Sequence, residues 1–199
     1  MQPTIQTRFD EIKRECWNEA LHAYGLAEIF RRKQKVLDKR INFITLLGVI
    51  IPGLVGATAM GYGLKFNMLP AMIAVGIFVL IIQLLLSILA LVYKWSDKMS
   101  YANESISENS RLSDDFRKLG ANQAIVLPDL EQQFQILSTR SESRSQQDNK
   151  VDIEEKENRY GMRHALRIFK RKCAGCGLEP ISLTPTDCDV CGNFKFSNF

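Results

Sequence analysis

The fold is decided by two apolar stretches, INFITLLGVIIPGLVGATAMGYGL (residues 41–64) and FNMLPAMIAVGIFVLIIQLLLSILALVY (residues 66–93). Neither stretch contains a charged residue or a histidine, and only Lys65 separates them. As helices rising ~1.5 Å per residue they would be about 36 and 42 Å long, which exceeds the ~30 Å hydrocarbon core of a bilayer. The sequence therefore predicts a two-helix transmembrane hairpin, although the mean hydropathy of the 199-residue chain is only -0.10.

Basic residues around the two stretches indicate their orientation in a membrane. Six precede the first stretch, namely Arg31, Arg32, Lys33, Lys35, Lys39 and Arg40, and Lys94 and Lys98 follow the second. Because positive flanking residues are retained in the cytoplasm, we expect both termini there and a short tip at about residues 62–70 on the far side. We expect no cleavable leader, since the first apolar stretch begins forty residues in, behind a charged segment.

Small residues mark one face of the first span. Gly53, Ala57 and Gly61 recur every fourth residue, so they share a helix face that another helix can approach closely. This candidate packing face would serve either within the hairpin or between protomers. Pro52 should kink the helix unless a neighbour satisfies the carbonyl that it frees.

Two polar residues, Gln83 and Ser87, interrupt the second span and share one face. A buried amide is costly in hydrocarbon without a partner, so Gln83 is expected either to hydrogen-bond another helix or to face water in a pore. One hairpin cannot enclose a water path, so a channel would require a homo-oligomer. Without charged side chains in the spans, such a channel would be a hydrophobic constriction rather than a charge-selective filter.

The segments outside the apolar stretches are predicted to be cytoplasmic helices. Residues 1–40 carry an apolar stripe at helical spacing that includes Ile5, Phe9, Ile12, Cys16, Ala20, Ala23, Ala27 and Phe30. After the second span we expect one helix ended by Gly120, one begun at Pro128 and one over residues 151–172. The stripe of the first of these is diluted by Asn109 and Ser113. The helices would form a bundle either within one chain or between protomers.

The strongest local signal is a C-x2-C-x11-C-x2-C pattern made by Cys173, Cys176, Cys188 and Cys191, with a glycine after each pair. Two such turns bring four thiolates to one tetrahedral centre, which is typical of structural Zn²⁺. Because no coordination position stays open, zinc would fold residues 173–199 into a small ribbon or knuckle pair rather than catalyse. Phe194 and Phe196 alternate as on a short strand.

Other interpretations of the cysteine tail stay open. Two disulfides are disfavoured by a cytoplasmic location, and an iron–sulfur cluster is a minor alternative. A basic run precedes the site, consisting of Arg163, Arg167, Lys170, Arg171 and Lys172. This run would either neutralise the metal centre or bind a nucleic acid, a nucleotide or an acidic partner, although no aromatic-rich recognition motif supports nucleic acid.

The predicted fold class is an all-α membrane protein. It comprises a cytoplasmic N-terminal helix (1–40), a transmembrane hairpin (41–94, spans about 41–64 and 66–93), a cytoplasmic helical region (95–172) and a zinc ribbon (173–199). No nucleophile and base stand together in a catalytic constellation, so we expect no enzymatic activity.

With two spans and this cysteine spacing, the chain resembles the SLATT proteins, two-span effectors associated with bacterial conflict systems. Within them it is similar to the mobilome CxxCx(11)CxxC subgroup, whose spacing it shows at Cys173, Cys176, Cys188 and Cys191. The resemblance covers nearly the whole chain. It implies a role in antiviral defence at the bacterial inner membrane, where a sensor protein or a nucleotide second messenger triggers oligomerisation and membrane damage.

Two hypotheses of function follow. The leading hypothesis is a homo-oligomeric effector that permeabilises the inner membrane, with the spans as the executing part. The alternative is a membrane-anchored adaptor, whose zinc ribbon recruits a protein or a nucleic acid while the hairpin only tethers it. The sequence does not choose the triggering signal.

Overall fold

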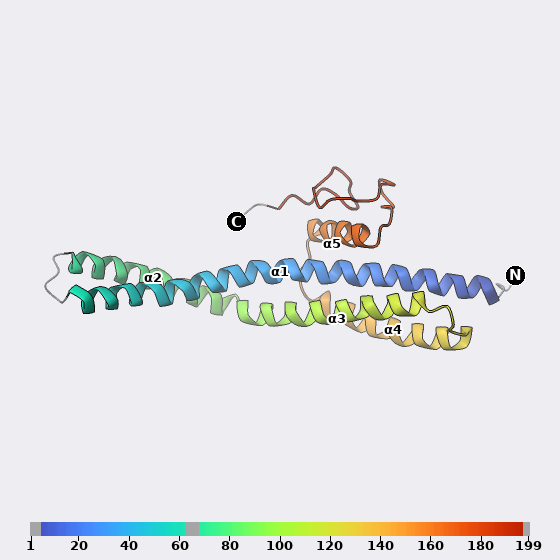
Figure 1. Cartoon of the computed structure of the whole chain (residues 1–199), viewed down its shortest axis with the longest axis horizontal. Coiled ribbons are helices and arrows are strands. Elements are labelled where there is room, and N and C mark those ends of the chain that lie inside the picture. Colours follow the sequence, from blue (N-terminus) through green and yellow to red (C-terminus); the bar gives the residue numbers. More distant parts are fainter. Residues whose placement is uncertain (1–4, 63–67, 197–199) are drawn as a thin grey trace. The chain divides into compact units, whose positions relative to one another are not determined.

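The computed structural model describes residues 5–62 and 68–196, which contain five helices (Figure 1). These are α1 (Ile5–Tyr62), α2 (Leu69–Val92), α3 (Trp95–Ala121), α4 (Leu127–Asp148) and α5 (Glu155–Ile168). The chain divides into two compact units. We call their described parts the core unit (residues 5–32 and 102–196) and the hairpin unit (residues 33–62 and 68–101).

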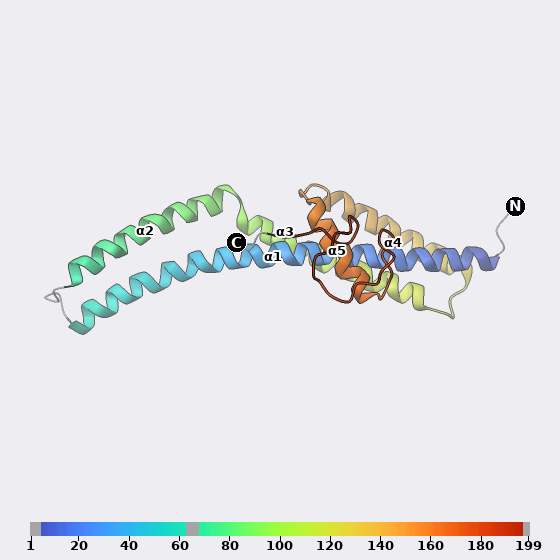
Figure 2. The ribbon, with the colours of Figure 1, turned by 90° about the horizontal axis from the view of Figure 1, so that it is seen from above.

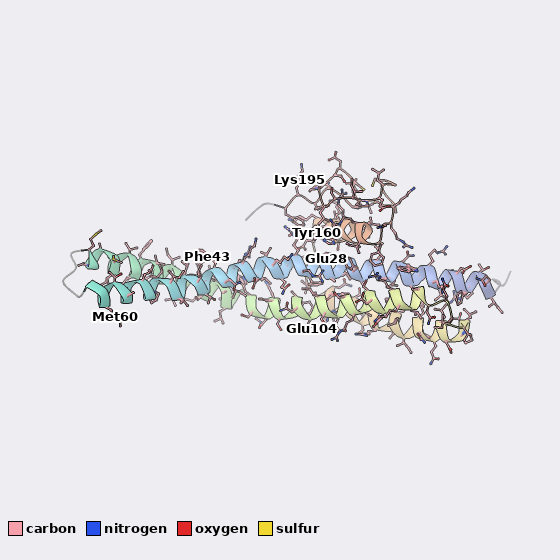
Figure 3. The ribbon with its side chains drawn as sticks, in the orientation of Figure 1. Glu28, Phe43, Met60, Glu104, Tyr160 and Lys195 are labelled. Carbon is pink, nitrogen blue, oxygen red and sulfur yellow. The ribbon has the colours of Figure 1, made fainter. Side chains whose placement is uncertain are left out.

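The hairpin unit pairs the second half of α1 with α2 (Figure 2). Both are long and apolar enough to cross a membrane, with mean hydropathies of 1.9 and 3.0 in their most apolar windows. Large apolar side chains are exposed on both helices. Phe43 and Met60, labelled in Figure 3, are 56% and 91% exposed. Residues 63–67 of the predicted tip, with Lys65, lie outside the described residues.

Helix α1 continues from the core unit into the hairpin unit without an assigned break. The segment predicted as a separate N-terminal helix and the described part of the first span are therefore one element. Pro52 lies inside it and does not end it. At the other end of the hairpin unit, Lys94 adopts a positive φ of 51° between α2 and α3, which separates these two helices.

From Ile12 onward, the apolar stripe in the core-unit part of α1 is buried within the chain, whereas Ile5 is exposed. One core cluster joins α1, α3 and α4 and consists of Ile12, Cys16, Ala20, Ala23, Leu112, Phe116, Leu119 and Leu130. In Figure 1, α5 and the C-terminal segment lie on the other side of α1. A second cluster forms there from Leu21 of α1, Ala165 and Leu166 of α5, and two cysteines of the tail. The stripe thus forms a bundle inside one chain.

Two predictions for the C-terminal third are wrong. The last helix covers Glu155–Ile168 rather than 151–172, because Glu154 and Glu157 form a capping box at its start and Lys170, at a φ of 50°, ends it. The described part of the tail also contains no strand. Phe194 and Phe196 instead pack their rings on Tyr160 of α5, each with its centroid 5.7 Å from the tyrosine ring. We therefore call residues 173–196 the knuckle segment.

Candidate metal centre

Two turns of the same geometry carry the four cysteines. In the first, the Gly177 amide donates to the carbonyl of Cys173 at 2.8 Å, and the Gly175 amide points to the Cys173 sulfur at 3.4 Å. In the second, Gly192 and Val190 make the same two contacts with Cys188, at 2.8 and 3.4 Å. The repeat explains why paired cysteines with two residues between them present their sulfurs to one point.

Glycine is required after each cysteine pair, but for a different physical reason at each position. Gly177 adopts a φ of 70°, a left-handed conformation that disfavours residues with a side chain. Gly192 has no such strain, but a Cβ there would collide with the backbone and hydroxyl of Thr186. The sequence pattern of two equivalent glycines thus serves two different needs.

The four sulfurs meet in one place. The Cys173 and Cys188 sulfurs are 3.9 Å apart, as are those of Cys176 and Cys191, and all four lie within 4.8 Å of one another. A tetrahedral centre with ~2.3 Å metal–sulfur bonds requires sulfurs about 3.8 Å apart. The four cysteines are therefore positioned to bind a metal ion.

The two sides of the site differ in exposure and in proton affinity. Cys173 and Cys191 are buried, whereas Cys176 is exposed. Hydrogen bonds from the backbone amides of Cys191 and Val190 lower the pKa of Cys188 to about 6. Burial raises the pKa of Cys191. A bound dication would hold all four sulfurs as thiolates, because metal coordination outweighs such differences.

Helix α5 holds the knuckle segment through two arginines. Arg163 is buried, and its Nε donates to the carbonyl of Ser182 at 2.8 Å while its Nη1 lies 3.9 Å from the Cys191 sulfur. Arg159 donates to the carbonyl of Asp189 at 2.9 Å. Of the predicted basic run, only Arg163 is recorded in contact with a ligand sulfur among the described residues.

Close backbone contact joins α5 to α1. A Cβ at Gly161 would lie 2.6 Å from the carbonyl oxygen of Gly25, so α5 has no room for a side chain there, and a Cβ at Gly25 would be a tight 3.2 Å from the carbonyl oxygen of Gly161. Beside this contact the buried Glu28 forms an ion pair with Arg31, and its other carboxylate oxygen lies 3.5 Å from Nε2 of His164. Figure 3 shows Glu28 and Tyr160 where α1 and α5 meet. The metal centre is thus connected to α1 through α5.

A buried polar cluster that the sequence did not reveal joins α3 to α4. Asp148 is 1% exposed, and its carboxylate accepts hydrogen bonds from Ser105 at 2.8 Å, Asn109 at 2.7 Å and Arg144 at 2.7 Å. Ser113, which we expected to weaken the apolar stripe, donates to the carbonyl of Ala20 at 2.8 Å. Such polar groups are tolerated in a core because each is satisfied.

A cavity of about 510 Å³ lies in the core unit between α1, the end of α4, residues 149–154 and α5. Asp148 and Asp152 are part of its lining, and none of its described lining residues is a lysine or an arginine. His22 also lines the cavity, and residues 151–153 with Asn158 place it beside the N-terminus of α5.

The candidate residues of the spans lie in different surroundings. The Gln83 side chain lies directly against Gly48 of α1, and its amide oxygen is buried without a hydrogen-bond partner in the described structure. Ser87 lines a small cavity of the hairpin unit with Thr45. Gly48 is four residues before Pro52, so its carbonyl is the one that the proline leaves without a helical donor.

The predicted small-residue face has no neighbour among the described residues. Ala57 is exposed, and a Cβ added at Gly53 or Gly61 would meet no described atom within 4 Å. A close contact between the two helices is described at Gly48, which lies against the one amide side chain of the other span.

One comparison with known proteins gives a match. The profile of a protein family described as "Mobilome CxxCx(11)CxxC protein" matches residues 13–194, which includes all four metal-site cysteines and both apolar helices. No curated protein and no solved structure matches the chain.

Proposed function

The chain belongs to the mobilome CxxCx(11)CxxC protein family, and from this premise we propose that it is a bacterial antiviral-defence effector that oligomerises and permeabilises the inner membrane. One observation carries the proposal. The hairpin unit exposes large apolar side chains along both of its helices, whereas the core unit gathers apolar side chains into two buried clusters and exposes others only at scattered positions such as Ile181. A protein built this way requires an apolar phase around the hairpin, and a bilayer supplies one.

In the proposed arrangement both helices of the hairpin span the inner membrane, and both termini face the cytoplasm. The basic residues between positions 31 and 40 precede the apolar half of α1. They support this orientation because positively charged flanking residues are retained in the cytoplasm. Arg40 lies 5.5 Å from the Trp95 ring, a cation–aromatic pair of the kind found at the level of lipid headgroups.

Oligomerisation would use surfaces that the single hairpin leaves open. The face with Gly53 and Gly61 has room for a second helix to approach closely. The buried amide oxygen of Gln83 has no hydrogen-bond partner among the described residues. A donor from another protomer would remove the free-energy cost of burying this oxygen in hydrocarbon, which favours oligomerisation. We propose that these residues form contacts between protomers or line the resulting path.

We propose that the metal is Zn²⁺ and that its role is structural. Four thiolates in tetrahedral arrangement suit zinc and leave no coordination position for a substrate. This closed centre agrees with the proposal that the chain is not an enzyme. It folds the knuckle segment, which together with the helical bundle would receive the signal of infection.

The trigger would be a sensor protein or a nucleotide signal acting on the core unit. The core-unit cavity has no lysine or arginine in its described lining but includes His22 and borders the N-terminus of α5, so it does not choose between these two triggers.

The test is the membrane potential of bacteria that carry this gene with its native neighbours, measured by dye fluorescence before and after phage challenge. We expect depolarisation with the native chain and none when residues 41–93 are replaced by an unrelated hairpin of equal length. Unchanged potential during successful protection would contradict the effector proposal.

A sharper variant pair tests the packing face. Gly53→Leu and Gly61→Leu place bulky side chains where another helix is proposed to approach, so both should reduce oligomer size and depolarisation. Leu84→Phe, at an exposed position of α2, serves as a bulky control. If the glycine variants behave like this control, the proposed face is not the one that packs.

One observation favours a second candidate, a membrane-anchored adaptor. Leu178 and Ile181 of the knuckle segment are 69% and 90% exposed, as expected of a surface that recruits a partner. An adaptor should keep its function after replacement of the hairpin, whereas the effector should lose it.

A further inference from the structure

Arg163 is a buried cation without a carboxylate partner. Its side chain comes from α5 and is only 7% exposed. Its recorded contacts are Ser182 O at 2.8 Å, Thr186 Oγ1 at 3.3 Å, and the carbonyl and sulfur of Cys191 at 3.4 and 3.9 Å. No carboxylate in the described part of the chain forms an ion pair with it. The other strongly buried arginine, Arg144, has Asp148 at 2.7 Å and Glu104 at 2.7 Å.

An unpaired guanidinium is expensive to bury, because desolvation of a charge costs several kcal/mol unless an opposite charge lies close by. Carbonyl and hydroxyl oxygens supply partial charges only. Among the described contacts of Arg163, the Cys191 sulfur is the one group that would carry negative charge on metal binding. Four thiolates around a divalent ion carry a net charge of −2, so the metal-loaded centre provides what the arginine lacks.

We propose that Arg163 is the counter-ion of the metal–thiolate centre, so that metal loading and the docking of α5 on the knuckle segment stabilise each other. This inference rests on the metal centre of the proposed function. By thermodynamic linkage, the free energy that Arg163 adds to metal binding equals the free energy that the bound metal adds to the docking of α5 on the knuckle segment. Because α5 also contacts α1 at Gly161 and Gly25, metal loading sets how firmly α1 is held in the core unit.

The chain offers a matched control on the same helix. Arg159 also reaches the knuckle segment, through the carbonyls of Asp189 and Asn193, at 2.9 and 3.4 Å. It has its own carboxylate, Glu155, at 2.8 Å, and no recorded contact with a ligand sulfur. Arg159→Gln therefore weakens the anchoring of the knuckle segment but leaves the positive charge beside the metal centre in place. Arg163→Gln weakens the anchoring and also removes that charge.

The experiment measures the apparent zinc affinity of the full-length protein in detergent, by competition with a chelator. We expect Arg163→Gln to weaken zinc binding by about 10- to 100-fold, the usual effect of removing a group that supports metal ligands. Arg163→Lys keeps the charge, so it should stay within about a factor of five of the native protein. Arg159→Gln should stay within about a factor of three.

Cobalt(II) separates this effect from collapse of the site. At saturating cobalt the absorption of a tetrahedral thiolate centre should be unchanged in Arg163→Gln, which would show that the four ligands still assemble and that only their affinity fell. Loss of the tetrahedral spectrum at saturation would overturn the proposal, because the arginine would then be needed to form the site.

Two further outcomes would overturn the inference while leaving the metal centre in place. One is a zinc affinity of Arg163→Gln equal to that of Arg159→Gln. The other is an Arg163→Lys variant as weak as Arg163→Gln, since the role would then belong to the hydrogen bonds of the guanidinium rather than to its charge. Failure of the native protein to bind zinc would instead contradict the metal centre itself.

Discussion

The core unit and the hairpin unit share α1 but use it in opposite ways. In the core unit, α1 buries one stripe against α3 and α4, and residues such as Cys16 and Ala20 are fully buried. In the hairpin unit the same helix exposes Val49 and Leu54, and α2 exposes Phe78 and Leu84. A helix with one apolar stripe finds its partner within the chain, whereas a helix that is apolar all round requires an apolar solvent.

Glycines show the same contrast. In the core unit, Gly25 and Gly161 bring two helix backbones into direct contact. In the hairpin unit, Gly53 and Gly61 have no described atom within 4 Å of an added Cβ, whereas Gly48 lies against the Gln83 side chain. The glycines of the core unit thus serve packing within the chain, while two glycines of the hairpin unit have room around them in the described structure. The predictions below test this division of roles.

The largest effect should come from removing a metal ligand in the core unit. Because Cys176 is exposed, Cys176→Ser creates no cavity in the core. It removes one of the four proposed metal ligands, and metal binding contributes about 10 kcal/mol or more to the folding of small zinc domains. We expect loss of stoichiometric zinc and of the ordered knuckle segment, measured by elemental analysis and amide hydrogen exchange.

Cys16→Ala is the matched cysteine control. Cys16 is buried in the α1 core, where burial raises the pKa of its thiol to about 11 and keeps it a neutral apolar group. This variant should keep one zinc per chain. Retention of stoichiometric zinc by Cys176→Ser, at unchanged affinity, would contradict the four-thiolate site.

The next effect concerns the buried charge of the core unit. Asp148→Ala leaves Arg144 buried beside too little negative charge, so we expect the core unit to lose about 3–5 kcal/mol of unfolding free energy. Denaturant titration of the full-length protein, followed by tryptophan fluorescence from Trp17, measures it. Glu142→Ala, an exposed carboxylate of the same helix, should change stability by less than about 0.5 kcal/mol. Equal effects of the two variants would show that the buried cluster is not stabilising.

A third prediction compares glycines of the two units directly. Gly161→Ala forces a methyl group against the carbonyl of Gly25 and should destabilise the core unit by about 1–3 kcal/mol. Gly53→Ala meets open space and should not lower stability, because alanine favours the helix more than glycine does. Thermal unfolding of both variants in detergent provides the comparison. A neutral Gly161→Ala would mean that α5 does not lie on α1 as described.

The smallest expected effect is a response of the core unit to acid. A hydrogen bond from Arg140 lowers the pKa of Glu108 below its ordinary value of 4.5. The stability from this pair is therefore full above the unfolded pKa and is lost as pH falls through the folded value. We expect unfolding free energy to fall below about pH 4.5, and Arg140→Gln to flatten that fall. The apolar parts of α1 and α2 contain no Asp, Glu or His and should not respond to acid.

How far the sequence predicted this molecule depended on how local each signal was. Charge-free stretches and cysteine spacing are local, so they identified the apolar helices and the four ligands. The buried cluster at Asp148 was missed because Ser105 and Asn109 are far from it in sequence and resemble ordinary surface residues. Gly25 packs against the backbone of Gly161, which is far from it in the sequence, and only the tertiary structure reveals that contact.

The small-residue face shows the limit of a local pattern. Regular spacing at Gly53, Ala57 and Gly61 predicts a packing face either within the hairpin or between protomers, because spacing states which residues share a face and not what the face meets. Among the described residues, Gly48 lies against the Gln83 side chain. Residues 48 and 52 are one helical hydrogen bond apart, so the carbonyl that Pro52 frees was a reason to look for a polar group near Gly48.

The central claim is that the hairpin unit crosses the membrane while the core unit stays in the cytoplasm. Single cysteines at Met68 and Ile181, both exposed, test it with a thiol reagent that does not cross membranes, against the native chain as background. We expect the reagent to label Met68→Cys in cells whose outer membrane is permeabilised and whose inner membrane is intact. It should label Ile181→Cys only after the inner membrane is also opened. Labelling of both positions from the same side would contradict the claim.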